Sequence, residues 1–556
     1  ADDAEHIIVA MGSVCQTTKE VVDLLNNSGQ KVGLVNIHLY RPFCKEAFVS
    51  AIPSTVKQIS VLDRTKEPGG VGEPLFLDVV AALRNTPFQN IPIFSGRYGL
   101  SSKNTTPGQI LAVYENKTKS EFTIGIVDDV TNLSLEYTDD IDTSPKDSVN
   151  CKFWGFGSDG TVGANKNSIK IIGDNTDMYV QAYFDYDSKK SGGVTISNLR
   201  FGKSYIGSAY LILKADFVAC HEASYIKKYD MVQELKDGGT FLLNCPWTPE
   251  ELDDKLPGQV KRYIAEHKIR FYIIDGVAIA KELGLDGRIN TILQAAFFKL
   301  SNIIPIEQAI QYMKEAAKAS YENKGDSIVK MNYDAIDRGE SGFTEVEIPK
   351  DWIDAVDEEI HKPLSIENEN LESFVNNIQI PVNAQLGNSL PVSAFMKYSD
   401  GSIPSGSSAF ERRGIAADSP VWNPDNCIQC NRCSLVCPHA VVRPVIMTNE
   451  EKDNAPLGMK SLPMIGFPDY HFGIVISSLD CQGCGSCANV CPGKKNEKAL
   501  TMKNMVENSG QQAYFDYGKT LSPKDEVFGK YKEDSVKGSQ FKQPLLEFSG
   551  ACAGCG

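Results

Sequence analysis

The chain has 556 residues, which is too long for a single hydrophobic core, so we expect several domains. Its composition is that of an ordinary globular protein, with 42% hydrophobic and 23% charged residues, and its formal net charge of -15 argues against nucleic acid as a partner. No apolar run reaches the roughly 18 residues that a membrane helix needs. We therefore expect a cytoplasmic protein that binds neither membranes nor nucleic acid.

Residues 1–97 alternate between short apolar strands and helices. The expected strands are residues 7–11, 31–37, 58–63 and 91–95, and the expected helices are residues 17–27 and 73–84. This alternation predicts a parallel sheet covered by helices. Residues 98–150 are rich in Asn, Thr, Asp and Pro, which predicts a trailing segment and a linker.

A second α/β unit is expected from about residue 151 onward. Its expected strands are residues 179–184, 194–199, 210–213, 240–244 and 270–274, and its expected helices are residues 224–235, 258–267, 289–300, 306–321 and 326–335. Between residues 351 and 417 only short apolar patches remain among polar residues. This pattern predicts a linker or wrapping arm without a core of its own.

Eight of the fifteen cysteines form two copies of the pattern C-x2-C-x2-C-x3-C-P. The first copy contains Cys427, Cys430, Cys433 and Cys437, and the second contains Cys481, Cys484, Cys487 and Cys491. This spacing is typical of domains with two 4Fe–4S clusters, in which the fourth cysteine of each run ligates the other cluster. We therefore expect one cluster on Cys427, Cys430, Cys433 and Cys491, and the other on Cys437, Cys481, Cys484 and Cys487.

A disulfide framework or a zinc site would account for the cysteine pattern less well. A disulfide framework is typical of short, cysteine-dense chains, and the rest of this long chain is not cysteine-dense. Zinc sites rarely combine cysteine triplets with a trailing Cys-Pro. Clusters beside free thiols indicate a reducing compartment.

The sequence stops just after a further pair, Cys552 and Cys555. A cube needs four ligands, so a third cluster on this pair would need two ligands from outside the chain. The chain also begins without a methionine, close to a strand-like run at residues 6–11. We therefore expect the middle part of a longer polypeptide.

Residues 155–160 match G-x-G-x-x-G after a strand-like run. A Rossmann dinucleotide site has this pattern, but no clear ribose-binding acid follows about 20 residues later. Closely spaced glycines also let backbone N–H groups face a phosphate at a helix start. The candidate anion-binding residues are Gly157, Asp159, Gly160, Thr161, Gly163 and Lys166. A glycine-rich turn without any ligand is the alternative.

A second candidate for anion binding is the run from Asp187 to Gly193. Its Lys189, Lys190 and Ser191 could meet a phosphate that the first loop does not reach, although a solvated charge pair in a hairpin would have the same sequence. Arg288 and Asn290, at a predicted helix start, are further candidates. We see no Ser-His-Asp arrangement and no paired carboxylates, so we assign no catalytic residue.

Several runs occur in one order and together closely resemble the single-chain pyruvate:ferredoxin (flavodoxin) oxidoreductases. They are the double cysteine motif, Leu39-Tyr40-Arg41-Pro42-Phe43, the glycine-rich run 157–166, the lysine-containing run 185–195 and the terminal run 548–556. The likeness extends over essentially the whole chain.

The resemblance implies a multidomain α/β fold with two parallel-sheet α/β domains, a linker arm and an α+β ferredoxin-like domain with two 4Fe–4S clusters. The implied parts are a transketolase C-terminal-like domain (1–147), a coenzyme A-associated α/β domain (148–350), a linker or short wrapping domain (351–417), the ferredoxin-like domain (418–520) and the start of a C-terminal thiamine diphosphate-binding domain (521–556).

The resemblance also implies the chemistry. Family members decarboxylate pyruvate on thiamine diphosphate, pass electrons singly through three 4Fe–4S clusters to ferredoxin or flavodoxin, and transfer the acetyl group to coenzyme A. Thiamine diphosphate and Mg²⁺ would bind in domains outside this chain, where the catalytic residues are also expected. The two candidate anion loops would hold the separate phosphates of coenzyme A, and the enzyme would be a homodimer.

Two alternatives remain open. One is a freestanding iron–sulfur electron-transfer module, which would leave both α/β units unexplained. The other is an oxidoreductase for a different 2-oxoacid, or one with NADP as acceptor through a fused flavin domain.

Overall fold

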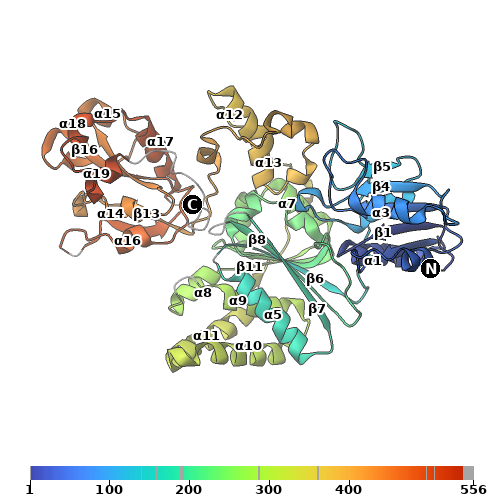
Figure 1. Cartoon of the computed structure of the whole chain (residues 1–556). Coiled ribbons are helices and arrows are strands. Elements are labelled where there is room, and N and C mark those ends of the chain that lie inside the picture. Colours follow the sequence, from blue (N-terminus) through green and yellow to red (C-terminus); the bar gives the residue numbers. More distant parts are fainter. Residues whose placement is uncertain are drawn as a thin grey trace.

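The computed structural model describes residues 2–139, 141–157, 159–187, 193–285, 288–359, 362–495, 497–505 and 508–542. Four parts follow one another along the chain: an N-terminal α/β part, a central α/β part, an arm and a cysteine-rich part (Figure 1). The N-terminal and cysteine-rich parts lie on opposite sides of the central part in this view. Within the described ranges, no helix combines the length and the apolar character needed to cross a membrane.

The N-terminal part is a five-stranded sheet in the order β2-β1-β3-β4-β5, and all neighbouring strands are parallel. Its elements are β1 (His6–Ala10), α1 (Val14–Asn27), β2 (Val32–Asn36), α2 (Lys45–Ser50), β3 (Gln58–Asp63), α3 (Pro74–Leu83), β4 (Ile93–Arg97), α4 (Pro107–Glu115) and β5 (Glu121–Thr123). The predicted parallel sheet is confirmed.

Strand β1 shows why the strands of this sheet correspond to continuous apolar runs in the sequence. Ile8 and Ala10 belong to the core under α1 and α4, whereas Ile7 and Val9 belong to the core under α2 and α3. Because successive side chains point to opposite faces, a strand buried on both faces must be apolar throughout.

The expected trailing segment is wrong for residues 107–123, which form α4 and complete the sheet with β5. Pro107 starts the helix, Thr106 accepts the N–H of Gln109 at 3.3 Å, and Ile110 and Val113 are fully buried. Thr-Pro at this position is a helix-start signal that the polar composition of the region concealed.

The central part is a seven-stranded mixed sheet in the order β12-β11-β10-β9-β6-β8-β7. Its strands are β6 (Val149–Phe156), β7 (Tyr179–Tyr186), β8 (Val194–Gly202), β9 (Ala215–Cys220), β10 (Leu235–Asn244), β11 (Arg270–Ile274) and β12 (Phe343–Glu345), and its main helices are α5 (Thr161–Asn175), α7 (Gly258–Glu266), α8 (Gly276–Glu282), α9 (Asn290–Ser301), α10 (Ile306–Tyr321) and α11 (Asp326–Ser341). Strands β6, β9, β10 and β11 are parallel, and β7, β8 and β12 add antiparallel edges.

Two expected elements of the central part are wrong. Residues 210–213 form no strand because side chains take their backbone groups: Arg200 donates to the Tyr210 carbonyl at 2.8 Å, and the Ile212 N–H donates to Asn198 at 3.0 Å. The strand is β9, immediately downstream. Residues 224–235 contain two short 3₁₀ turns rather than a helix, and Glu222 caps the first of them by accepting the N–H of Ser224.

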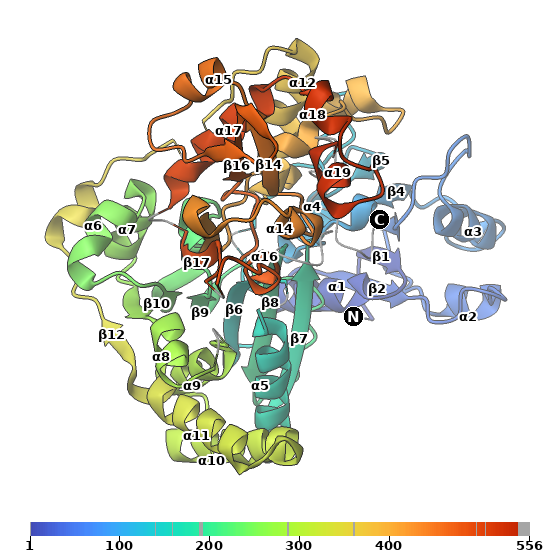
Figure 2. The same cartoon turned by 90° about the vertical axis from the view of Figure 1, so that its left-hand side faces the viewer.

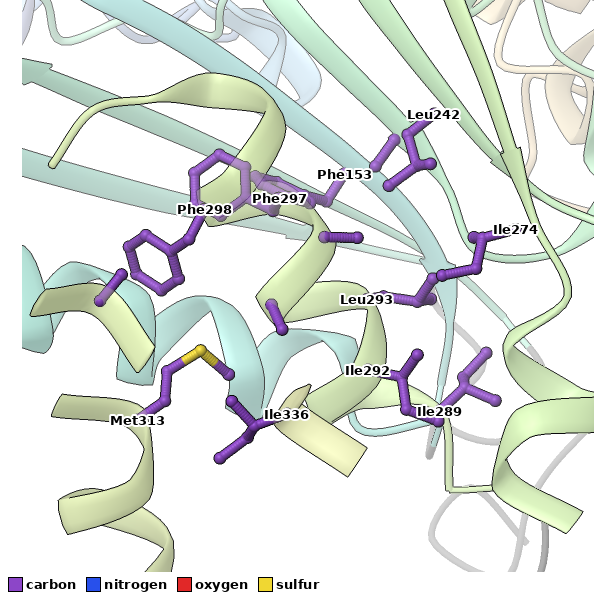
Figure 3. Close-up of a cluster of buried hydrophobic side chains, with 14 of the residues drawn as sticks. Phe153, Leu242, Ile274, Ile289, Ile292, Leu293, Phe297, Phe298, Met313 and Ile336 are labelled. Atoms are coloured by element: carbon purple, nitrogen blue, oxygen red, sulfur yellow. The ribbon is translucent and has the colours of Figure 1, made fainter. Parts of the chain in front are cut away.

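One of the two cores of the central part lies between the sheet and helices α9, α10 and α11 (Figure 3). Phe153 of β6 and Phe297 of α9 pack edge to face with ring centroids 5.0 Å apart. Ile292 of α9, Met313 of α10 and Ile336 of α11 belong to the same core. Helix α9 is thus enclosed on several sides, as its nearly continuous apolar sequence requires.

Gly339 allows α11 to approach α9. A methyl group at this position would lie 2.3 Å from the carbonyl oxygen of Ile292, a backbone atom that cannot rotate away. Gly339→Ala should therefore lower the free energy of unfolding by about 1–3 kcal/mol, measured by urea denaturation. The control is Gly163→Ala in α5, where the new methyl group meets no atom within 4 Å and should leave stability equal or slightly higher.

The arm contains α12 (Glu369–Phe374), a π-helical turn (Val375–Gln379) and α13 (Ile380–Asn383). The expectation that it lacks a core is wrong, because Phe374, Val375 and Ile378 are buried together against Tyr398 and neighbouring apolar residues. The arm is also fixed to the N-terminal part, where the N–H of Val392 donates to the Val127 carbonyl at 2.9 Å.

The cysteine-rich part contains two small antiparallel sheets, β13–β17 and β14–β16–β15. Its elements are β13 (Asp418–Trp422), α14 (Arg432–Leu435), β14 (Val442–Met447), α15 (Asn449–Asp453), β15 (Leu462–Met464), β16 (Phe467–Ile476), α16 (Ser486–Asn489), β17 (Leu500–Asn504), α17 (Gln512–Thr520), α18 (Asp525–Phe528) and α19 (Val536–Phe541). In both overall views, α10 and α11 lie at the end of the central part that faces away from the cysteine-rich part (Figure 1, Figure 2).

Candidate functional site

Two cavities in the cysteine-rich part are each lined by four cysteines. Each cavity combines three cysteines of one run with the fourth cysteine of the other run. The first contains Cys427, Cys430, Cys433 and Cys491, and the second contains Cys437, Cys481, Cys484 and Cys487, each around about 350 Å³ of space. Across the described ranges, no group of three or more His, Cys, Asp or Glu lies close enough to hold a single metal ion.

The two cysteine turns share one backbone conformation. Gln429 and Asn431 adopt positive φ angles of 57° and 58°, and Gly483 and Gly485 occupy the equivalent places in the second run with 71° and 73°. Glycine takes this conformation without strain, whereas glutamine does so only when its surroundings hold it there. Gln429 is held from both ends of its amide, which donates to the Pro463 carbonyl at 2.8 Å and accepts the N–H of Ile465 at 3.0 Å.

Backbone N–H groups point at the sulfur atoms in both runs. The N–H of Gln429 donates to Cys427 Sγ and that of Gly483 to Cys481 Sγ, both at 3.4 Å. The trailing cysteines follow the same rule, with N–H donors at 3.3 Å from Cys437 Sγ and 3.2 Å from Cys491 Sγ. Such donors stabilise negative charge on sulfur.

Burial opposes ionisation of these thiols. It raises the pKa of Cys481 to about 12 and the pKa of Cys487 to about 11. Thiolates here therefore need a compensating positive charge, which iron bound by the four sulfur atoms would supply, with the thiol protons released to solvent. The set of four sulfur donors per cavity fits a cubane cluster.

The glycine-rich turn joins β6 to α5 at the carboxyl edge of the central sheet. Gly155 is required there, because a methyl group would lie 2.5 Å from the Asp159 carboxylate and from Thr161 Oγ1. The Asp159 carboxylate accepts the N–H groups of Phe156 and Thr161 at 3.0 and 2.7 Å and the Thr161 hydroxyl at 2.6 Å. Asp159 and Thr161 thus bind each other, and Thr161 is only 1% exposed.

The other predicted residues of this turn lie at the surface. Gly160 and Gly163 are exposed, and Lys166 is exposed with its Nζ 5.4 Å from the centre of the Phe184 ring. Asn290, the first residue of α9, lies beside Gly160, where an added methyl group would meet its side chain at 3.1 Å. The starts of α5 and α9 therefore come together, and Arg288 lies exposed just before α9.

The second predicted loop is a direct neighbour of the first. The N–H of Gly157 donates to the Gly193 carbonyl at 2.7 Å. Lys189, Lys190 and Ser191, which fall between Asp187 and Gly193 in the sequence, lie outside the described residues. Cys552 and Cys555 also lie outside the described residues. The structure therefore brings the start of α5 next to one end of the lysine-containing run.

The sequence reasoning missed two residues near the turn: His221, which follows β9, and Asn244, which ends the neighbouring strand β10. His221 Nδ1 lies 2.7 Å from Thr161 Oγ1, and Asn244 donates to the His221 carbonyl and accepts the N–H of Gly276, both at 2.9 Å. Burial lowers the pKa of His221 to about 4, so the ring is neutral at pH 7. Polar residues at the carboxyl ends of parallel strands are the signal that could have found them.

Protein-family comparisons cover most of the chain. Residues 150–341 match the family described as pyruvate ferredoxin/flavodoxin oxidoreductase, and residues 4–110 match pyruvate:ferredoxin oxidoreductase core domain II. Residues 361–416 match a domain of unknown function, and residues 426–495 match a 4Fe-4S dicluster domain.

Whole-chain comparisons agree with these matches. The chain is 50% identical over 561 residues to a pyruvate-flavodoxin oxidoreductase of Enterobacter agglomerans and 51% identical over 563 residues to a pyruvate:ferredoxin oxidoreductase of Moorella thermoacetica. Both alignments cover 100% of this chain and 47% of the relative, so the chain spans about half of their length. It is also 44% identical to a pyruvate dehydrogenase [NADP(+)] of Cryptosporidium parvum, of which it covers 30%.

Proposed function

We propose that the chain belongs to the family of these oxidoreductases, to which it is 50–51% identical over its whole length, and that it serves the oxidative decarboxylation of pyruvate. In that reaction pyruvate and coenzyme A give acetyl-CoA, CO₂, one proton and two electrons. These 556 residues would supply the electron relay and the coenzyme A-binding part. Thiamine diphosphate and Mg²⁺ would bind outside them, and ferredoxin or flavodoxin would accept the electrons.

The two four-cysteine cavities carry this proposal. Each would hold one 4Fe–4S cluster through three thiolates of one run and one of the other, which is the crossed ligation of two-cluster ferredoxins. Each cluster, when bound, supplies reversible one-electron transfer at low potential. Cys552 and Cys555 would begin a third site whose remaining ligands come from outside this chain.

Coenzyme A is proposed to bind where the two anion loops meet. The surface-facing Gly160, Gly163 and Lys166 would receive one phosphate group at the start of α5, and Lys189 and Lys190 would receive another. Arg288 and Asn290 would add donors from the start of α9, which lies beside Gly160. The Thr161 hydroxyl and N–H bond to Asp159, so these two residues would shape the turn rather than touch the ligand.

A freestanding electron carrier is the alternative from another class, and one experiment separates the two. After anaerobic loading, the chain should contain about eight iron and eight sulfide ions and should also bind coenzyme A in calorimetry. A simple carrier would contain the iron but would not bind coenzyme A. Zinc in place of iron would contradict both functions.

The substrate needs its own test. Exchanging the homologous region of the Moorella thermoacetica relative for this chain should preserve ferredoxin reduction that requires both pyruvate and coenzyme A. If ferredoxin is reduced with 2-oxoglutarate and not with pyruvate, the proposed substrate is wrong. If only NADP is reduced, the proposed acceptors are wrong. Flavodoxin-named relatives are 40–50% identical to the chain and the NADP-named one is 44% identical, so this experiment, and not sequence identity, decides the acceptor.

We also propose a homodimer in the cytoplasm. The homodimer rests on the family resemblance, and gel filtration with light scattering tests it. None of the thirteen cysteines of the described residues forms a disulfide bond, which supports the proposed cytoplasmic location because the cytoplasm is a reducing compartment.

A further inference from the structure

Lys228 carries a buried positive charge at the junction between the central part and the cysteine-rich part. It follows the 3₁₀ turn Ala223–Lys227, and its Nζ is shielded from solvent without a hydrogen-bond partner in the described part of the chain. An ammonium group in this state costs several kcal/mol, so an arrangement that retains it calls for a source of negative charge.

Within the described residues Lys228 forms no ion pair, although the Glu222 carboxylate lies close enough to act on its pKa. Burial, and secondarily the repulsion of Arg413, lowers its pKa to about 8, while Glu222 acts in the opposite direction. Glu222 accepts the N–H of Ser224 at 3.1 Å, and Arg413 forms an ion pair of 3.8 Å with Asp187. Lys228 is therefore still mostly protonated at neutral pH.

Lys228 lies against the arm at Gly414, and the arm there contacts the chain segment before Cys481. A methyl group on Gly414 would be 4.0 Å from Lys228 Nζ, and the N–H of Gly414 donates to the Leu479 carbonyl at 2.7 Å. Leu479 stands two residues before Cys481. The same stretch of the arm also lies against the turn itself, since a methyl group on Gly483 would lie 3.5 Å from the Ala416 side chain.

The other cavity belongs to a different side of the cysteine-rich part. Its turn packs on α19, where Asn431 donates to the Lys537 carbonyl at 3.3 Å and Ser434 donates to Gln540 at 2.7 Å. The contacts that link Lys228 to a cysteine run, through Gly414 and Leu479, lead to the cavity that contains Cys481.

We propose that Lys228 raises the reduction potential of the cluster held by Cys437, Cys481, Cys484 and Cys487, by placing a buried positive charge against Gly414 of the arm, which is hydrogen-bonded to the segment before Cys481. The inference rests on the proposed function, because it requires a cluster in each cavity. Reduction adds one electron to this site and moves no proton, so the site becomes more negative by one charge. A nearby positive charge favours that state, and the electron resides preferentially in the cavity beside the arm.

The test is a redox titration of the iron-loaded chain, followed by electron paramagnetic resonance. Lys228→Met should lower the reduction potential of one cluster, so that at a fixed solution potential the ratio of its reduced to its oxidised form falls several-fold, up to about tenfold. The reduction potential of the other cluster should stay unchanged. Glu222→Gln, which keeps an oxygen for the Ser224 N–H, should shift the same cluster in the opposite direction. Lys227→Met is the matched control, because Lys227 is exposed and water screens its charge.

A Cys430→Ala background identifies the cluster that moves. The shift caused by Lys228→Met should persist there, because only the cavity beside the arm would still be complete. Full iron content with unchanged potentials in both Lys228→Met and Glu222→Gln would overturn this inference alone. Absence of iron from the unaltered chain would contradict the proposed function itself. If Lys228→Met does not fold, the reduction potential of Glu222→Gln tests the inference: a higher potential for one cluster supports it, and unchanged potentials contradict it.

Discussion

Replacing Cys430 by alanine should remove about half of the iron from the loaded chain, leaving roughly four iron ions of about eight. Cys430 lines only the first cavity, and a cube with three protein ligands is labile. The second cavity keeps its four cysteines, so the absorption of one cluster should remain. Iron and sulfide analysis under anaerobic conditions measures both effects.

Crossed ligation makes a sharper prediction about the fourth cysteines. Cys491→Ala should remove the same cluster as Cys430→Ala, although Cys491 belongs to the other run, and a double variant should lose no more iron than either single variant. Cys437→Ala should remove the other cluster. Cys44→Ala is the control, because this exposed cysteine lies outside both runs and its loss should leave the iron content unchanged. Additive iron loss in Cys430→Ala/Cys491→Ala would show that each run serves its own cluster.

Replacing Lys190 by alanine should weaken coenzyme A binding about 10- to 100-fold. A charge-assisted phosphate contact contributes about 1.5–3 kcal/mol, and each 1.4 kcal/mol is tenfold in affinity. Titration calorimetry on the chain measures the dissociation constant directly, and iron content should stay the same. Lys166→Ala, on the neighbouring α5, should weaken binding by a similar factor.

The control for these variants is Lys318→Ala, an exposed lysine of α10 outside the proposed site. Its affinity should equal that of the unaltered chain. Lower salt should strengthen binding to the unaltered chain more than to Lys190→Ala, because the lost contact is ionic. Equal affinity in Lys166→Ala, Lys189→Ala and Lys190→Ala would leave the glycine-rich turn and the lysine run without a ligand role.

Regular elements with one dominant local signal could be predicted from the sequence. Helix α10 and strand β11 lie within the expected residues because their periodicity of 3.6 or their apolar run decides the conformation without help from distant residues. Residues 210–213 carry the same apolar signal but form no strand, because Arg200 and Asn198 bind their backbone. Such long-range side-chain contacts leave no mark at the position they affect.

The candidate site divides in the same way. The spacing of the cysteines within each run is that of the turn that three ligands of one cube require, so the sequence alone predicts the eight ligands. The sequence also shows the glycine run and the lysine run as separate features. That they are neighbours, through the Gly157–Gly193 hydrogen bond, depends on the antiparallel pairing of β6 with β8.

By itself, then, the sequence determined the local features of this protein: its cysteine turns, its α/β alternation and its resemblance to the pyruvate:ferredoxin (flavodoxin) oxidoreductases. Only the tertiary structure decided which distant groups meet, as when the arm brings Gly414 between Lys228 and the segment before Cys481. The physical reason is that a turn or a helix depends on interactions between residues a few positions apart, which a local pattern can encode. A buried charge depends on the summed packing of segments hundreds of residues apart, and no local pattern encodes that sum.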